Sequence, residues 1–278
     1  MKRESQTSPM SVLSQVMGIV NVTPDSFSDG GRWTSTAAAV DHAMRLVEQG
    51  ADVLDIGGES TRPGAEPVGE AEEIERVAPV IAAVRARWGG PISVDTMKPA
   101  VARAAVAAGA TMWNDVTALS QAPDSLAVAA ELGCAVVLMH MKGEPRTMQA
   151  DPRYGDVVAE VRDYLRDRAE AAMAAGVARE NIWLDPGIGF GKTLEHNMAL
   201  TARLGELVAL GFPVLYAASR KRTIQAVDPT AVEATDRLGG SLALALEGAR
   251  RGARMVRVHD VRETVQALKL LAAVAAAG

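Results

Sequence analysis

The sequence has very little of what most metal and redox sites require. It contains a single cysteine in 278 residues, Cys134, which lies in the apolar run CAVVLM. One thiol cannot form an internal disulfide, so we expect a small buried core residue in a reducing environment. The histidines have neither HExxH nor any other ligand spacing, which argues against a zinc site; they are His42, His140, His196 and His259.

Two common catalytic motifs are also missing. There is no GxSxG sequence, which argues against acyl transfer by a serine nucleophile. The stretch LDPGIGFGKT, residues 184–193, ends like a phosphate-binding P-loop, but a P-loop has four residues between its first glycine and the Gly-Lys pair. That spacing puts the first glycine at Pro186, which has no N–H to offer a phosphate. The motif therefore does not predict a nucleotide site.

The chain lacks a positive charge excess and an apolar segment near its beginning. Its formal net charge is -5, so no basic field would recruit nucleic acid or a membrane surface. The run SRKR at 219–222 is too short to supply such a field. The opening MKRESQTSPM is polar, so we expect residues 1–11 to form a flexible tail rather than a signal peptide or anchor. Together these features predict a cytoplasmic protein.

A repeated pattern indicates the fold. Seven times a glycine ends a helix-like stretch and an apolar run follows: QGADVLDIG, GGPISVD, AGATMWND, LGCAVVLMH, AGVARENIWLD, LGFPVLYAAS and RGARMVRVH. Glycine suits the end of a helix because it adopts the left-handed conformation readily. With QVMGIVNV this gives eight strands, and the runs between them have helical periodicity, as at Ile74, Val77 and Ile81. We predict one α/β domain over residues 12–278, a (β/α)8 TIM barrel, with an open doubly wound sheet as the alternative.

In such a barrel the active site lies on the loops after the carboxyl ends of the strands. Every strand is followed there by polar residues: Asn21; Glu59, Thr61 and Arg62; Asp95; Asn114 and Asp115; His140 and Lys142; Asp185; Ser219, Arg220 and Lys221; and Arg257, His259 and Asp260. Any one of them could simply cap the next helix. As a set, they combine cations suited to phosphate or carboxylate with acids and amides suited to the donor-rich edge of a heterocycle. This indicates a transferase acting on a phosphorylated, nitrogen-rich ring.

The same loops resemble those of a known family. The runs GIVNVTPDSFSDGG, DIGGESTRPGA, ISVDT, NDV, VVLMHMKGEPRTMQ, LDPGIGFGKT, SRK and RVHDV occur in that order between residues 18 and 261. They resemble dihydropteroate synthase, the pterin-binding barrel family of folate biosynthesis. The resemblance implies a TIM barrel that condenses 6-hydroxymethyl-7,8-dihydropterin diphosphate with p-aminobenzoate to give 7,8-dihydropteroate and diphosphate, with Mg²⁺ present.

The resemblance also assigns roles to the matching positions. The pterin would bind at Asp95, Asn114, Met139, Asp185 and Lys221. The acids and the amide would meet the ring donors, each of which would cost about 1–3 kcal/mol if left unpaired. Asn21 would hold Mg²⁺, and the diphosphate would bind at Asn21, Thr61, Arg257 and His259. The p-aminobenzoate positions would be Phe27, Thr61, Arg62, Pro63, Phe190, Lys221 and Arg222.

The reaction implied by the resemblance is SN1-like, with diphosphate leaving before the amine attacks. The catalytic residues would be Asp95, Lys221 and Asn21, and Asp95 would stabilise the pterin cation. The family further implies a homodimer and a target for sulfonamides, which imitate p-aminobenzoate. The Ala- and Leu-rich stretches after Thr235 and Asp260 could form the dimer interface or could pack against their own barrel.

The chain departs from the family pattern after the seventh strand. The family most often has a glycine followed by Ser-Arg-Lys-Ser, whereas this chain has Ala217 and then SRKR, and Gln225 replaces a later glycine. Arg222 could bind the carboxylate of p-aminobenzoate or could turn outward into solvent. What these departures put in question is the affinity for p-aminobenzoate and sulfonamides, not the reaction.

Two other functions fit a pterin-binding barrel. One is methyl transfer from a reduced folate to a corrinoid protein, and the phosphate-anchor positions Arg257 and His259 argue against it. The other is pterin binding without catalysis, and the presence of Phe27, Arg62 and Phe190 argues against that.

Overall fold

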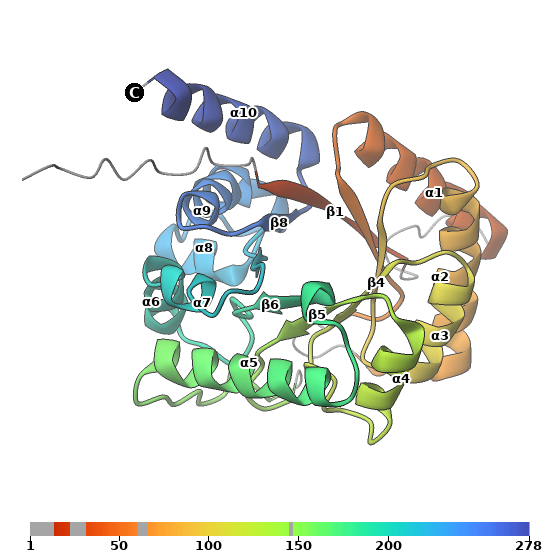
Figure 1. Cartoon of the computed structure of the whole chain (residues 1–278). Helices are drawn as coiled ribbons and strands as arrows, with labels where there is room; N and C mark the ends of the chain where they lie inside the picture. The colour runs from red at the N-terminus through yellow and green to blue at the C-terminus, as the bar shows by residue number, and fades with distance from the viewer. Residues whose placement is uncertain (1–13, 23–31, 61–65, 145–146, 278) are drawn as a thin grey trace, which may run out of the picture.

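The chain folds into a parallel β-barrel surrounded by helices (Figure 1). The computed structural model describes residues 14–22, 32–60, 66–144 and 147–277, so the predicted tail over 1–11 lies outside the described residues. The strands are β1 (Gln15–Asn21), β2 (Val53–Gly57), β3 (Ile92–Asp95), β4 (Met112–Asp115), β5 (Ala135–Met139), β6 (Ile182–Asp185), β7 (Leu215–Tyr216) and β8 (Met255–Val258). Each of the eight predicted runs contains one of them.

The strand order identifies a barrel rather than an open sheet. The strands pair in parallel in the order β6-β5-β4-β3-β2-β1-β8-β7, so neighbours in sequence are neighbours in space. A parallel bridge between Leu184 and Val214 joins the two ends of this order, and the Leu184 N–H donates to the Pro213 carbonyl at 3.0 Å. The predicted (β/α)8 barrel is confirmed, and the doubly wound alternative is wrong.

Helices fill the connections between the strands and form the outer layer (Figure 1). They are α1 (Arg32–Glu48), α2 (Glu70–Arg85), α3 (Pro99–Ala107), α4 (Ser125–Leu132), α5 (Val157–Ala174), α6 (Leu194–Ala202), α7 (Gly205–Val208), α8 (Arg222–Val227), α9 (Leu238–Arg250) and α10 (Val261–Ala277), with 3-10 turns at Arg179–Asn181 and Ala234–Arg237. None of the described helices is long and apolar enough to span a membrane.

The glycine pattern at the helix ends is confirmed in all but one instance. Positive φ angles occur at the predicted positions Gly50, Gly109, Gly133, Gly176, Gly211 and Gly252. The exception is the Gly89–Gly90 pair, because α2 has already ended at Ala86, which is right-handed. A side chain at Gly90 would instead collide with the Trp88 ring, since a Cβ there would lie 2.0 Å from it. Any other residue at this position would therefore force the Trp88 ring to move.

The core has two parts that leave the carboxyl ends of the strands free for polar residues. One part packs the outward strand residues against the helices, with Leu54, Ile56 and Trp113 fully buried in it. The other fills the barrel with one side chain from each of six strands: Met17, Val53, Met112, Val137, Leu215 and Met255. Because side chains alternate along a strand, the next inward positions along these strands lie above this plug. Cys134 is buried, as predicted.

Candidate active site

The predicted pterin positions lie side by side at the carboxyl ends of the strands. Asn21, Gly57, Asp95 and Asn114 occupy paired positions across β1, β2, β3 and β4, and Met139 pairs with Asp185 across β5 and β6. Asn114, Met139 and Asp185 are buried, with exposed fractions of 4%, 3% and 3%. Parallel strands therefore bring residues far apart in sequence into one cluster inside the barrel mouth.

Arg257 joins two carboxylates at the centre of this cluster. Its Nε donates to Asp55 Oδ2 at 2.6 Å, and its Nη2 donates to Asp95 Oδ2 at 2.7 Å. The amide of Asn114 also donates to Asp55 Oδ2, at 3.3 Å. Charge-assisted bonds of this kind are stronger and more directional than neutral ones. Two of the three guanidinium nitrogens of Arg257 are thus engaged with the protein, and its predicted contact with diphosphate stays a prediction.

Asp55 is the residue that the sequence analysis missed. It lies in the middle of β2, is fully buried, and its Oδ1 has no hydrogen-bond partner among the described residues. Val53 and Asp55 alternate with outward Leu54 and Ile56, so Asp55 faces the barrel interior two residues before Gly57. The signal in the sequence was the single acid inside the otherwise apolar run VLDIG. Burying a carboxylate in such a strand costs free energy unless the carboxylate has a polar partner.

Burial controls the protonation of the central groups. It raises the pKa of Asp95 to about 7, although the neighbouring Arg257 guanidinium favours the carboxylate and opposes this shift. It also raises the pKa of Asp185 to about 6, against the opposing effects of the Gly187 N–H bond and Lys221. For Lys221, burial lowers the pKa to about 8. Near neutral pH both carboxylates and the lysine can therefore be charged together, within a narrow pH range.

The loop after β6 brings Phe190 next to Lys221. Asp185 accepts a 2.7 Å bond from the Gly187 N–H, which orients its carboxylate at the start of this loop. Further along, the Phe190 ring lies under the Lys221 ammonium, 4.0 Å from the ring centroid to Nζ. Lys221 immediately precedes α8 and is half-buried. Residues predicted for both substrates therefore meet here.

His259 is tied to the end of β7 by Ser219. Its Nδ1 lies 3.0 Å from Ser219 Oγ, and its backbone N–H donates to the same oxygen at 3.2 Å. The following residue, Asp260, accepts bonds of 3.0 and 2.5 Å from Arg220, whose φ of 58° is unusual for a residue other than glycine. These contacts fix the loops after β7 and β8 against each other.

Some residues at the rim serve the loops rather than a ligand. Asp115 accepts from the N–H groups of Thr117 and Leu119 at 2.7 and 3.0 Å, and Glu59 pairs with Lys98 at 2.6 Å. The contacts of Asp115 and Glu59 are thus local bonds within the rim, which was the alternative to ligand binding. Asp95 is different, because α3 begins at Pro99 without any side-chain cap bond and the Asp95 carboxylate pairs with Arg257.

Four predicted residues lie outside the described residues: Phe27, Thr61, Arg62 and Pro63.

No group of three or more His, Cys, Asp or Glu in the described part of the chain converges as a metal site. Asn21, the last residue of β1, offers a hard amide oxygen at the barrel mouth. That donor suits Mg²⁺, which usually takes one or two protein ligands and completes its shell with phosphate oxygens and water.

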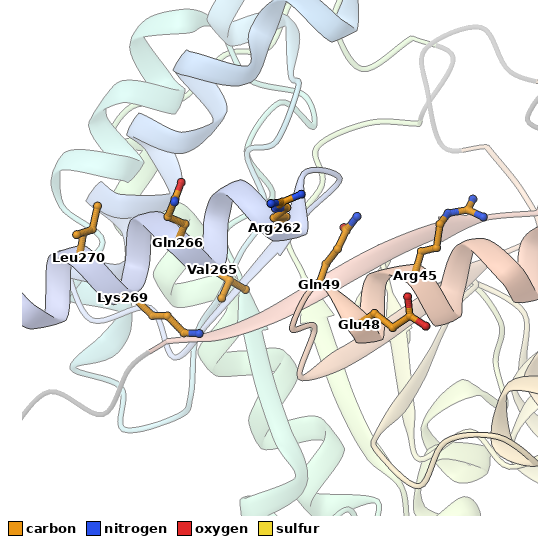
Figure 2. Close-up of a pocket in the computed structure, with 8 residues that line it drawn as sticks. All are labelled: Arg45, Glu48, Gln49, Arg262, Val265, Gln266, Lys269 and Leu270. Atoms are coloured by element: carbon orange, nitrogen blue, oxygen red, sulfur yellow. The ribbon is translucent and has the colours of Figure 1, made fainter.

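One groove on the described surface lies away from this cluster. It has a volume of about 680 Å³ and is lined from the end of α1 and from α10, among others by Arg45, Glu48, Arg262 and Lys269 (Figure 2). None of the predicted site residues lines it. We assign no role in the reaction to this groove.

The comparisons with known proteins identify the family. Residues 17–259 match the family model of pterin-binding enzymes. The chain is 49% identical to the dihydropteroate synthase of Escherichia coli strain K12 over 258 residues, which cover 93% of this chain and 90% of that protein. The chain belongs to the dihydropteroate synthase family.

Solved dihydropteroate synthases agree with the fold and with the kind of ligand. The enzyme of Xanthomonas albilineans with 4-aminobenzoic acid has a TM-score of 0.89 and 53% identity, covering 95% of this chain and 93% of that one. The same enzyme with 7,8-dihydropteroate gives a TM-score of 0.86 at 51% identity, covering 95% and 94%. Dihydropteroate synthases are transferases, so the chain is an enzyme of that class. The corrinoid and non-catalytic alternatives are thereby disfavoured.

The structure also places the residues at which this chain departs from the common dihydropteroate synthase pattern. Gln225 accepts a 2.9 Å bond from Arg237, whose buried guanidinium also donates to the carbonyls of Ala231 and Arg220. Gln225 therefore helps hold the segment between α8 and α9. Arg222, at the first position of α8, is exposed and forms no ion pair with a described residue.

Proposed function

We propose that the protein condenses 6-hydroxymethyl-7,8-dihydropterin diphosphate with p-aminobenzoate, giving 7,8-dihydropteroate and diphosphate. The observation that carries this proposal is the convergence of three buried or half-buried acceptors, Asp95, Asn114 and Asp185, with Lys221 and Arg257 at one end of the barrel. Three acceptors beside two cations suit a ring with several N–H donors that carries an anionic group. The ligands named for the Xanthomonas albilineans enzyme, 4-aminobenzoic acid and 7,8-dihydropteroate, support p-aminobenzoate as a substrate and 7,8-dihydropteroate as the product.

In this proposal Asp55 determines which atoms of the site face the pterin. A carboxylate can only accept, so Asn114 must turn its NH2 group toward Asp55 and its carbonyl oxygen away from it. That leaves an acceptor for a ring N–H. Asp95 and Asp185 would accept the other ring donors, Lys221 would donate to a ring acceptor, and Met139 would pack against the ring.

The leaving group would be held by residues from the first and last strands. Asn21, Arg257 and His259 would bind the diphosphate, together with Thr61. Mg²⁺, with Asn21 as its protein ligand, would supply a positive charge that stabilises the departing oxygens. Ser219 would keep the His259 ring in place, because it contacts both Nδ1 and the backbone N–H of that residue.

The bond changes would follow an SN1-like order. The bond between the methylene carbon and the diphosphate oxygen breaks first, and its electron pair leaves with the diphosphate. Asp95, ionised and held by Arg257, stabilises the delocalised pterin cation electrostatically. The amine lone pair of p-aminobenzoate then forms the C–N bond, and the extra proton of the nitrogen passes to solvent.

The second substrate would bind over the Phe190–Lys221 contact. Phe190 would form one wall of the site, and Phe27, Thr61, Arg62 and Pro63 would complete it. We favour binding of the p-aminobenzoate carboxylate by Arg222, because this arginine is exposed beside Lys221 and has no carboxylate partner within the described residues. Sulfonamides would compete for the same place.

Two experiments test the reaction and its order. Purified protein with Mg²⁺ and both substrates should form 7,8-dihydropteroate, detected by mass; no product would refute the proposed activity. A series of ring-substituted p-aminobenzoates should then react at rates that depend little on the basicity of the amine, because diphosphate departure precedes attack. A steep dependence would refute the SN1-like order.

The protein would act as a cytoplasmic homodimer. The α10 residues Leu270 and Val274 support this assembly, because they are 64% and 72% exposed and lie one helical turn apart. Sedimentation at micromolar concentration should give twice the monomer mass for the wild type, and a monomer for Leu270→Glu/Val274→Glu. A wild-type monomer would refute the dimer.

A further inference from the structure

The lysine of LDPGIGFGKT is buried and has no obvious part in the reaction. Lys192 is 3% exposed and directly precedes Thr193, the N-cap of α6. Its ammonium lies 3.0–3.1 Å from four acceptors: the backbone oxygens of His140, Gly187 and Phe190, and Nδ1 of His140. An ammonium group has three hydrogens, so these contacts use all of them and leave none for a ligand.

These contacts connect two loops of the active-site rim. His140 directly follows β5, whereas Gly187 and Phe190 belong to the loop after β6. The loops approach so closely that a Cβ at Gly187 would lie 2.0 Å from the His140 oxygen, and one at Gly191 would lie 2.2 Å from the Lys142 oxygen. Both glycines also have positive φ angles, 68° and 61°. The two loops therefore lie in direct backbone contact on either side of this ammonium.

The free-energy cost of burying the Lys192 ammonium indicates that this group connects the two loops. Burial lowers the pKa of Lys192 to about 7, with Asp185 opposing the shift. A buried charge is tolerated only when its hydrogen-bond donors are satisfied, and here the backbone oxygens of two loops do so. Removing the ammonium would leave those oxygens without a donor and the loops without their connection.

Other bonds hold the rest of the same loop. Asp185 is fixed by β6 and by the Gly187 N–H, Gly189 N–H donates to Asn197 at 2.8 Å, and Gly191 O accepts from Tyr154 at 2.8 Å. The carbonyl of Phe190, in contrast, is held by Lys192. Loss of the ammonium should therefore disturb Phe190 more than Asp185.

We propose that Lys192 is a positioning residue that holds the Phe190 ring beneath the Lys221 ammonium and so forms the p-aminobenzoate side of the site before that substrate binds. This inference rests on the proposed function. Lys192 touches neither substrate, and it acts by fixing the backbone that carries Phe190. Preorganisation of this kind lowers the cost of binding, so its loss should appear in the affinity for p-aminobenzoate.

The test compares Lys192→Met with Lys192→Arg. Methionine keeps an apolar stem and removes all three donors, whereas arginine keeps donors of a different shape. For Lys192→Met we expect the KM for p-aminobenzoate to rise about tenfold, with kcat and the Kd for the pterin diphosphate changed less than about threefold. Lys192→Arg should recover part of that affinity. The Kd is measured by calorimetry without p-aminobenzoate.

The control variant is Arg179→Met. Arg179 also donates to two loop carbonyls, those of Leu210 and Gly211, but it precedes β6 at the other end of the barrel. It should leave both substrate constants unchanged. Equal losses for both substrates in Lys192→Met, or an unchanged KM for p-aminobenzoate, would overturn the inference. If Lys192→Met does not fold, Lys192→Gln, which lacks the charge and one of the donors, is measured in its place under the same criterion. Wild-type turnover is measured first, so failure of the proposed reaction is seen separately.

Discussion

Replacing Asp55 with asparagine tests whether this buried acid organises the pterin site. The substitution keeps the size of the side chain and removes its charge. In the unsubstituted protein, the Asp55 carboxylate accepts hydrogen bonds from Arg257 at 2.6 Å and from Asn114 at 3.3 Å. An asparagine at this position could either donate or accept, so Asn114 would no longer be compelled to turn its carbonyl oxygen toward the ligand.

The expected loss follows from these two contacts. A hydrogen bond to a charged group contributes about 1.5–3 kcal/mol, and the new amide would still accept weakly from Arg257. A misoriented Asn114 would leave one ring donor unpaired, at about 1–3 kcal/mol. A combined loss of about 2 kcal/mol corresponds to about a 30-fold lower kcat/KM for the pterin diphosphate. The KM for p-aminobenzoate should change little, because Asp55 lies beneath the pterin positions.

Steady-state kinetics with each substrate varied in turn measure both constants. Asp52→Asn is the control, because it makes the same chemical change directly before β2, where the exposed Asp52 accepts a 2.8 Å bond from the Val16 N–H away from the pterin positions. It should keep wild-type kcat/KM. If Asp55→Asn lowered kcat/KM for the pterin diphosphate less than threefold while remaining folded, Asp55 would not orient the site.

Three further predictions concern the chemistry and the second substrate. Asp95→Asn should lower kcat about 100-fold and change KM values less than threefold, because the carboxylate acts on the developing cation; equal effects on kcat and KM would contradict this. Asp95 and Asp185 must be ionised, and their pKa values are raised to about 7 and about 6. Measured from pH 5.5 to 9.5, kcat/KM for the pterin diphosphate should therefore fall below pH 7 and more steeply below pH 6. It should fall again above pH 8 as Lys221 loses its proton. In Asp95→Asn the acid limb should move to about pH 6, and an unmoved limb would reassign it. Arg222→Ser should raise the KM for p-aminobenzoate about threefold, a modest effect because the arginine is exposed, and an unchanged KM would make Arg222 a bystander.

The barrel was predictable because its pattern is local. Apolar runs, helical periodicity and glycines at helix ends repeat along the chain, and parallel strands connected by helices have few ways to pack. The Gly89–Gly90 pair was misinterpreted because the reason for glycine there is contact with Trp88, a feature of packing that composition does not reveal.

The polar rim was predictable for a related reason: residues after parallel strands must meet at one end. The partners of each residue were not predictable. Arg257 was predicted as a diphosphate anchor, and the sequence did not reveal that it also bonds to Asp55 and Asp95, which are far from it along the chain. No role was predicted for Lys192, because its contacts with the His140 and Phe190 carbonyls exist only once the two loops have folded against each other.

Diphosphate release in the presence of Mg²⁺ and the pterin diphosphate, with and without p-aminobenzoate, tests the proposed condensation most directly. The proposal predicts sustained release only when p-aminobenzoate is present, with one dihydropteroate formed for each diphosphate. Sustained release without p-aminobenzoate, or binding of the pterin diphosphate without any product, would contradict it.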